Sequence, residues 1–542
     1  MTSGSENAGN EKVLLRAEHL SVAFPRPNGK EKIVVNDISF SLREGEILGI
    51  AGESGSGKSM TALAVMGLLP ENAKRKADGI FFNGTDLCAK NKKEQRQEEH
   101  LRQALSGNEM AMIFQEPLTS LNPVLTIQKQ MEEPLLLHTD LASEERKTVI
   151  LEALEQAELK NGARLLSAYP HQLSGGMRQR VMIAMAMINK PRLLIADEPT
   201  TALDAVTERE IVALIRRLAK ENHTSVIFIS HDLAVLRALC DRVMIMRDGR
   251  IVEEGTTEQV FEAPQEEYTR ALMKAAVKGP KEKLLQSEPQ GGSSEKKSGT
   301  EADEAIMLSA QHVSVLYKRA MGLFRKPEEK QAVADVSFAV QKREIFGIVG
   351  ESGCGKSTLL KVIAGLLPEF HGKVSSTFGM QMVFQDPYTS LNPAKRVGWI
   401  LEEPLRLKTN LTKEERRAQV LAILRETELP EDVINRRVAE LSGGQRQRVA
   451  IAAALITKPE LVLLDEPVSA LDVTVQAQIL ELLLRLQREH ELTYVFVSHD
   501  MAVVRKICDR VMVMKDGRAV ECGATEELFL HPKEEYTKKL LG

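Results

Sequence analysis

Short runs of apolar residues recur along the chain, and each ends at a cluster of glycine, charged or hydroxyl residues. EILGIAG spans 46–52, RLLIAD spans 192–197 and SVIFIS spans 225–230. Runs that are apolar throughout are typical of parallel strands buried on both faces, while the pattern of KSMTALAVMGLL at 58–69 is typical of a helix. We therefore predict an α/β fold, with functional residues gathered where strands end.

Several sequence words occur twice, in the same order, which predicts two related domains. The pairs are GESGSGKS at 52–59 and GESGCGKS at 350–357, LSGGMRQR at 173–180 and LSGGQRQR at 441–448, IADEP at 195–199 and LLDEP at 463–467, ISHD and VSHD around His231 and His499, and EEYT at 266–269 and 534–537. We place the domains at 13–273 and 305–542. Residues 274–304, which include SEPQGGSSEKKSG, read as a flexible linker, with a short binding segment as the alternative.

The second copy is shorter than the first. Lys58 and Lys356 are 298 positions apart, whereas Ser174 and Ser442 are 268 apart, so about 30 residues are missing between these points. We assign the missing piece to Glu71–Asn108, whose segment KNKKEQRQEEHLRQ is typical of an exposed helix. A surface excursion of this kind is expected to be removable without disturbing a core.

Composition excludes several classes of protein. The chain has 542 residues, of which 43% are hydrophobic and 27% charged, so a wholly disordered protein is excluded. The net charge of −4, from 72 basic and 76 acidic residues, argues against a protein held mainly by nucleic-acid phosphates, so no nucleic-acid partner is expected, while local basic patches stay open. Apolar runs such as 181–188 fall far short of the roughly 20 residues of a membrane span, and the N-terminal MTSGSENAGNEK has no apolar signal core. The five cysteines lack CxxC spacing, which favours a reducing compartment over a disulfide or zinc scaffold.

The first repeated word, GxxxxGKS, is the pattern of a P-loop between a strand and a helix. Its glycines let backbone N–H groups approach phosphate oxygens. Lys58 and Lys356 would reach the β- and γ-phosphates, and the hydroxyls of Ser59 and Ser357 would bind Mg²⁺. A plain glycine turn before a helix is the alternative, and two complete matches disfavour it. The other expected ATP-binding residues of the two loops are Gly52, Glu53, Ser54, Gly55, Ser56 and Gly57, and Gly350, Glu351, Ser352, Gly353, Cys354 and Gly355.

Acidic residues and a histidine follow the next two apolar runs of each copy. Asp197 and Asp465 would hold Mg²⁺, while Glu198 and Glu466 could polarise the water that attacks the γ-phosphate. His231 and His499 would contact the γ-phosphate and position that water. The alternatives are carboxylates that merely begin a loop and a histidine that caps a helix or lies in the core. Their recurrence at the same spacing favours the catalytic interpretation.

The word LSGG, whose serine stands 23 residues before the aspartate in both copies, makes the chain resemble the ATP-binding cassette (ABC) family over nearly its whole length. This resemblance implies that each cassette has a helical subdomain carrying the signature word, beside a P-loop NTPase core. It also implies that the signature binds the γ-phosphate of nucleotide held by the opposite cassette, at a helix N-terminus that favours an anion. A flexible turn before a basic helix is the alternative. The signature residues are Ser174, Gly175 and Gly176, and Ser442, Gly443 and Gly444.

The same resemblance extends to further residues. Gln115 and Gln385 match the Q-loop glutamine that senses Mg²⁺ and the membrane partner, and 202–204 and 470–472 match the D-loop. Phe24 and Tyr317 stand where the family places an aromatic ring on adenine, although an aromatic ending a strand is as often a core residue. The family's head-to-tail dimer would give two composite ATP sites. All site residues are present in both copies, so we expect both sites to hydrolyse ATP; the one departure is Met177 where Gln445 stands in copy two.

The segments FQEPLTSLNPVLTI and FQDPYTSLNPAKRV, with EEYTRALM and EEYTKKLL, are similar to the oligopeptide, dipeptide, nickel and glutathione importer branch. That similarity implies two transmembrane permeases, an extracellular or periplasmic solute-binding protein, a peripheral position at the cytoplasmic face of the inner membrane, and peptide as the default substrate. Nickel and glutathione stay open. No iron–sulfur cluster is expected, because the cysteines do not cluster. The alternatives are a twin-cassette translation factor on the ribosome, a DNA-repair ATPase and an exporter.

Overall fold

The apolar runs of the sequence form the inner strands of a six-stranded sheet in each half of the computed structural model. The structure describes residues 12–26, 30–88, 92–115, 120–201, 203–277, 306–319, 328–376, 379–469 and 471–541. Strands β3 (Ile47–Gly52), β8 (Leu193–Asp197) and β9 (Ser225–Ile229) are buried at every position. The predicted parallel pairing is confirmed, because β3 pairs with β9 and β9 with β8 in parallel. The chain forms two compact units: the first is Met1–Leu203 with Thr207–Lys274, and the second is Ala275–Gly542 with Asp204–Val206.

In the first unit, the six-stranded sheet has the order β11-β10-β3-β9-β8-β7, and only the pairing of β11 with β10 is antiparallel. Its outer strands are β7 (Met110–Ile113), β10 (Arg242–Arg247) and β11 (Arg250–Thr256). A second, antiparallel sheet contains β1 (Val13–Pro25), β2 (Glu31–Arg43), β4 (Lys74–Lys76), β5 (Gly79–Phe82) and β6 (Thr85–Asp86). One hydrophobic core joins both sheets to the helix after β3, through residues such as Leu20, Ile50 and Val65.

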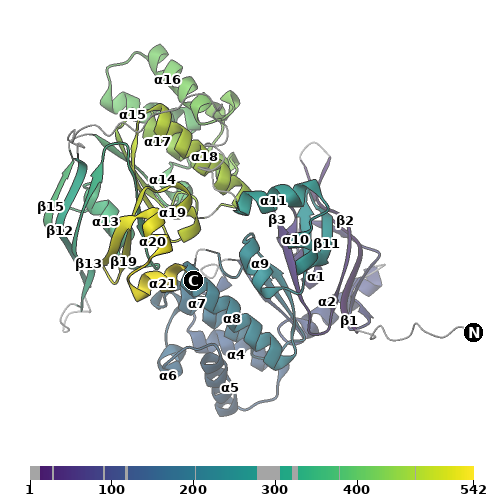
Figure 1. Cartoon of the computed structure of the whole chain (residues 1–542). Helices are drawn as coiled ribbons and strands as arrows, with labels where there is room; N and C mark the ends of the chain where they lie inside the picture. Colours follow the sequence, from purple (N-terminus) through teal and green to yellow (C-terminus); the bar gives the residue numbers. More distant parts are fainter. Residues whose placement is uncertain are drawn as a thin grey trace, which may run out of the picture. The chain divides into compact units, whose positions relative to one another are not determined.

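The helices of the first unit fall into two groups. Helices α4, α5, α6 and α7 contact one another and form a separate helical subdomain, as the resemblance predicts (Figure 1). The helices, in chain order, are α1 (Lys58–Met66), α2 (Lys92–Leu105), α4 (Ile127–His138), α5 (Ser143–Gln156), α6 (Gly162–Leu166), the 3₁₀ helix η1 (Pro170–Gln172), α7 (Gly175–Met187), α8 (Ala205–Asn222), α9 (Leu233–Leu239), α10 (Thr257–Glu262) and α11 (Glu267–Val277).

The second unit repeats this plan. Its six-stranded sheet has the order β16-β17-β18-β14-β19-β20, and its antiparallel sheet the order β13-β12-β15. The strands are β12 (Ile306–Arg319), β13 (Glu328–Gln341), β14 (Ile345–Val349), β15 (His371–Ser376), β16 (Met380–Val383), β17 (Leu461–Asp465), β18 (Thr493–Ser498), β19 (Arg510–Lys515) and β20 (Arg518–Ala524). The helices are α13 (Lys356–Ile363), α14 (Pro387–Ser390), α15 (Val397–Lys408), α16 (Lys413–Glu426), η2 (Glu431–Asn435), η3 (Val438–Glu440), α17 (Gly443–Leu455), α18 (Val473–Glu489), α19 (Met501–Ile507), α20 (Thr525–Leu530) and α21 (Glu535–Leu541).

The segment that is longer in the first copy contributes to the core, contrary to the expectation of a surface excursion. It supplies β5, β6 and α2, and Ile80 and Phe82 of β5 are almost fully buried. The predicted helix α2 is present, but the side chain of Arg102 ties it to the rest of the unit. Its guanidinium donates to the backbone oxygens of Val65 (2.6 Å) and Leu87 (2.9 Å). In the second unit β15 pairs along β12, where β4 and β5 pair with β1, so one strand replaces two.

The predicted linker and the predicted lack of a membrane span can be compared with the described residues. Residues 274–277 of the predicted linker are helical, in α11, and residues 278–304 lie outside the described residues. Among the helices that the structure describes, none combines the length and the apolar character needed to cross a bilayer.

Candidate functional site

The two P-loops have backbone conformations that require glycine. Gly52 and Gly57 have φ angles of 148° and 103°, and the matching Gly350 and Gly355 have 151° and 107°. A Cβ atom on Gly52 would lie 2.2 Å from the backbone oxygen of Met246, which is far inside van der Waals contact. The loops connect β3 to α1 and β14 to α13, so their N–H groups lie at a helix N-terminus, where an anion is favoured.

The P-loop lysines are buried and are held by their own loops. Lys58 is 5% exposed, and its Nζ donates to the backbone oxygens of Gly52 (2.8 Å) and Glu53 (2.9 Å). Lys356 makes the same bonds, at 2.7 Å and 3.0 Å, to the first two residues of its loop. A buried ammonium must be hydrogen-bonded, and these bonds hold both charges at the loop that would receive phosphate.

In both units the serine and the aspartate that are expected to bind Mg²⁺ are hydrogen-bonded to each other. The Oγ of Ser59 donates to Oδ1 of Asp197 at 3.0 Å, and Ser357 donates to Asp465 at the same distance. Burial raises the pKa of Asp197 to about 6, against the lowering effect of the bond from Ser59, and burial also raises the pKa of Asp465. Hydroxyl and carboxylate oxygens are the ligands that Mg²⁺ prefers. A cation would therefore stabilise the ionised aspartates, so the donor set fits this metal.

The expected catalytic glutamate of the first unit lies at the end of β8 in a strained conformation. Glu198 has φ 46°, and its N–H still donates to the oxygen of Ile229 (3.0 Å), which keeps the residue tied to β9. Its Oε2 accepts from Nε2 of Gln115 (3.0 Å) and Oγ1 of Thr201 (2.9 Å), and lies 3.3 Å from Nδ1 of His231. The fold thus brings together three residues that the sequence had placed in one site.

The second unit builds the same arrangement with one difference. Glu466 has φ 47°, and its Oε2 accepts from Nε2 of Gln385 (2.8 Å) and lies 3.2 Å from Nδ1 of His499. Ser469 stands where Thr201 stands in the first unit, but its hydroxyl donates to the backbone oxygen of Glu466 (3.1 Å) instead of the carboxylate. The sequence does not reveal that the Thr201 hydroxyl bonds to the carboxylate, because nothing in the local pattern of Thr201 distinguishes it from Ser469.

Each glutamate lies within ion-pair distance of a histidine, at 3.3 Å in the first unit and 3.2 Å in the second. Burial alone would raise the pKa of both glutamates, but the hydrogen bond and charge of the histidine outweigh it, so the pKa values of Glu198 and Glu466 are lowered. Conversely, burial would lower the histidine pKa, and the glutamate partner raises the pKa of His231 and His499. The glutamates are therefore ionised, the state in which a carboxylate can accept a hydrogen bond from water.

The histidines are placed by the helices that follow them. Asp232 caps α9, and its Oδ1 accepts from the N–H groups of Ala234 (2.7 Å) and Val235 (3.4 Å). Asp500 caps α19 in the same way. Capping by an aspartate fixes the point where a helix begins. The preceding histidine is consequently held in the turn between the strand and that helix, facing the glutamate.

The signature words begin helices, as predicted. Ser174 is the N-cap of α7 and accepts from the N–H of Met177 (3.3 Å), and Ser442 caps α17 by accepting from Gln445 (3.3 Å). In the second unit the Gln445 side chain also accepts from the N–H of Ser442 (3.2 Å), which completes a capping box. A methionine side chain cannot accept this bond in the same way. The sequence departure at Met177 therefore removes half of a helix cap.

Met177→Gln is expected to complete the capping box of α7 and to stabilise the start of that helix by about 0.5 to 1 kcal/mol. Hydrogen–deuterium exchange of the peptide covering 173–180 in the full chain would show slower exchange. Gln445→Met is the reciprocal variant and should speed exchange over 441–448. Equal exchange in variant and parent at both helices would contradict this explanation of the departure.

The predicted adenine-stacking residues differ in exposure. Phe24 packs partly against the core of the first unit, whereas Tyr317 is 43% exposed. Their contact with adenine remains a prediction. In the proposed D-loops, positions 202 and 470 lie outside the described residues.

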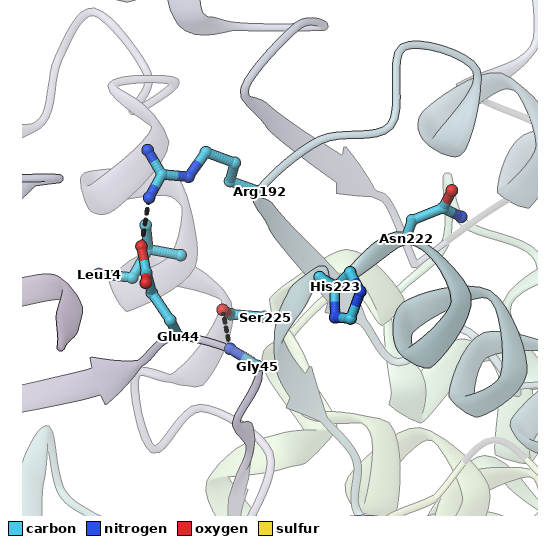
Figure 2. A pocket seen from close by; sticks show the side chains of 7 residues that line it. All are labelled: Leu14, Glu44, Gly45, Arg192, Asn222, His223 and Ser225. Atoms are coloured by element: carbon cyan, nitrogen blue, oxygen red, sulfur yellow. Dashed lines mark hydrogen bonds and ion pairs between the residues drawn. The ribbon is translucent and has the colours of Figure 1, made fainter. Parts of the chain in front are cut away.

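Two cavities help to locate the site. The larger, about 380 Å³, is lined by Glu44, Gly45, Arg192 and Ser225 among others, at the amino ends of β3, β8 and β9, and Figure 2 shows Arg192 directed toward Glu44. The P-loop and acidic residues lie at the carboxyl ends, so this cavity is not the expected nucleotide site. A cavity of about 140 Å³ in the second unit is lined by Gln385, Glu466 and Gly443, among others, so it borders both the expected catalytic glutamate and the signature word.

With this geometry established, comparison with known proteins identifies the class. The family model described as ABC transporter matches residues 35–201 and 333–469, and the chain belongs to this family. It is accordingly an ATP-binding ATPase of the ABC type. A second model, described as oligopeptide/dipeptide transporter, C-terminal region, matches residues 252–299.

Particular relatives match over almost the full length. The chain is 41% identical to the peptidoglycan transport ATP-binding protein YejF of Agrobacterium fabrum (strain C58 / ATCC 33970), over 98% of this chain and 96% of that protein. It is 42% identical to the glutathione import ATP-binding protein GsiA of Escherichia coli (strain K12), over 99% and 90%. A solved structure of an archaeal ribosome recycling factor, aABCE1, in complex with the ribosomal stalk protein aP1, matches 94% of this chain and 90% of its own with a TM-score of 0.58; at 24% identity it shows the fold alone.

Proposed function

We propose that this ABC ATPase energises the import of short peptides through two membrane permeases, using two composite ATP sites that both hydrolyse ATP. The observation that carries this proposal is the duplication of a complete hydrolytic cluster. In each unit a buried lysine, a serine–aspartate pair and a glutamate bonded to glutamine and histidine recur with nearly the same distances. A unit that served only as a structural partner would not need this cluster, and both units have it.

Within each cluster the residues have separate tasks. Lys58 and Lys356 bind the β- and γ-phosphates, and the glutamates polarise the attacking water while the histidines position it. Mg²⁺, held by the serine–aspartate pairs near the Q-loop glutamines, would neutralise phosphate charge when bound. Because little covalent chemistry falls to the protein in phosphoryl transfer, positioning and electrostatics provide most of the catalysis.

Each composite site combines the P-loop of one cassette with the signature of the other. We assign Ser442, Gly443 and Gly444 to the nucleotide held by Lys58, and Ser174, Gly175 and Gly176 to the nucleotide held by Lys356. The caps at the starts of α7 and α17 support this assignment, since a helix N-terminus with exposed glycine N–H groups binds an anion. Binding of ATP would then draw the cassettes together and move the permeases.

Peptide as the substrate class is supported by two findings. The oligopeptide/dipeptide model matches 252–299, and the relatives are named for peptidoglycan transport and glutathione import. Glutathione is a tripeptide, and fragments of peptidoglycan carry short peptides, so both names are consistent with this class. We further infer a solute-binding protein as the selecting partner and a peripheral position at the cytoplasmic face of the inner membrane.

The test is a tagged chain carrying Glu198→Gln and Glu466→Gln, trapped with ATP and purified from detergent-solubilised native membranes. We expect two polytopic permeases to co-purify, identified by mass spectrometry, together with a solute-binding protein whose ligand names the substrate. A chain carrying Lys58→Ala and Lys356→Ala should retain far less of the binding protein, because it cannot reach the ATP-closed state. Ribosomal proteins without permeases would overturn the importer proposal in favour of a translation factor, and permeases of an exporter would overturn its direction.

A further inference from the structure

A repeated sequence word outside the nucleotide site reaches the P-loop in both units. Tyr268, in the first EEYT word, is the second residue of α11, and its hydroxyl accepts a hydrogen bond from the N–H of Glu53 at 3.3 Å. Tyr536, in the second EEYT word, is the second residue of α21 and accepts from the N–H of Glu351 at 3.1 Å. Both contacts join the end of a unit to its phosphate-binding loop.

In each unit the tyrosine and the phosphate-binding lysine contact the backbone of the same loop residue. The N–H of Glu53 donates to the phenol of Tyr268, while the C=O of Glu53 accepts from Nζ of Lys58 at 2.9 Å. In the second unit the carbonyl of Glu351 accepts from Lys356 at 3.0 Å. The residue after the first loop glycine is therefore held from both sides, by a phenol oxygen and by the ammonium group.

Each tyrosine is itself fixed in place. The guanidinium carbon of Arg247 lies 4.8 Å from the ring centre of Tyr268, and Nζ of Lys515 lies 4.9 Å from that of Tyr536. The entry to α11 is anchored by Glu253, whose carboxylate accepts from the N–H groups of Gln265 (2.7 Å) and Glu266 (3.2 Å).

The second unit has the same anchor. Glu521 accepts from the N–H groups of Lys533 (3.0 Å) and Glu534 (3.2 Å) at the entry to α21. Strand, helix entry, tyrosine and P-loop are thus connected in the same way in two units whose antiparallel sheets differ. Packing peculiar to one unit would not explain why the same set of contacts occurs in both.

We propose that Tyr268 and Tyr536 are positioning residues for ATP binding, each fixing the P-loop peptide that holds the phosphate-binding lysine of its own cassette. This inference rests on the proposed function, because it takes Lys58 and Lys356 to bind the phosphates of ATP. The region matched by the oligopeptide/dipeptide model, 252–299, contains Tyr268, so one residue of that region contacts the P-loop of its own cassette.

The test uses the full chain carrying both Tyr268→Phe and Tyr536→Phe. We expect KM for ATP, and Kd for the fluorescent analogue mant-ATP, to rise about threefold to tenfold, the factor associated with one ordinary hydrogen bond. We expect kcat at saturating ATP to stay within about twofold, because binding in the ground state and in the transition state is weakened alike. Tyr494→Phe is the matched control, since it removes a buried hydroxyl that bonds to the oxygen of Leu483 at 3.2 Å, at the amino end of β18; KM should not move.

A change of less than about twofold in both KM and Kd would overturn the inference. A leucine pair, Tyr268→Leu with Tyr536→Leu, separates the hydroxyl from the ring. If the phenylalanine variant behaves like the parent and only the leucine variant binds ATP weakly, the ring acts by packing and the hydroxyl has no positioning role. Lys58→Ala with Lys356→Ala distinguishes the two levels: retained ATP hydrolysis in that chain defeats the proposed function, whereas its loss alongside an unchanged phenylalanine variant defeats only this inference.

Discussion

Replacing Lys58 and Lys356 together with alanine is expected to abolish ATP hydrolysis by the full chain, lowering turnover about a hundredfold or more. The reason lies in the burial of the two ammonium groups. Both lysines are at most 5% exposed and are held by two carbonyl oxygens of their loops, so each charge is fixed where phosphate would bind. Removing a fixed charge from a water-poor site costs more than removing a mobile one from the surface.

Phosphate release from MgATP measures this effect. Lys74→Ala and Lys342→Ala provide the matched control, because these lysines are exposed, with one surface ion pair each, and lie in the same two units. The control chain should keep the parent's turnover. Turnover in the P-loop variant above a few per cent of the parent's, with the fold intact by circular dichroism, would count against the assignment of these loops as the ATP sites.

The second large effect is expected at the glutamates. Glu198→Gln and Glu466→Gln should each lose a measurable share of turnover, and the double variant should keep less than about one hundredth of it, because a general base contributes at least that factor. Burial would raise the pKa of both carboxylates, but the histidine partner lowers it, and both glutamates have the same strained backbone. Glutamine preserves the shape of the side chain and part of its hydrogen bonding, but its neutral amide cannot polarise water as a carboxylate does.

Comparing the two single variants tests whether both sites are active. Glu262→Gln serves as control, since its carboxylate is 57% exposed and its partner Arg237, at 3.2 Å, is also exposed, on α9. Unchanged turnover in Glu198→Gln together with complete loss in Glu466→Gln would show that one site alone hydrolyses ATP. The extra bond from Thr201 to Glu198 gives the two glutamates different surroundings, so unequal rates would still agree with two active sites.

Sequence reasoning worked best where a local pattern has only one good structural outcome. A run that is apolar at every position, such as β3 or β9, must be buried on both faces, and a GxxxxGKS word after it must turn into a helix. It failed for the segment 71–108. The charged character of α2 concealed Arg102, whose head group is buried, and the strand pairing that buries Phe82 leaves no local signal.

The sequence by itself determined the α/β class, the duplication and the chemical identity of the clusters, because periodicity, glycine and the spacing of repeated words depend only on neighbouring positions. Only the tertiary structure decided which of the remaining polar groups meet. Tyr268 and Glu53 are 215 positions apart and come together because β10 and β11, which lead into α11, pair on the edge of the sheet beside β3. Hydrogen bonds of this kind depend on the order of strands, and strand order is set by packing of the whole unit rather than by any segment of it.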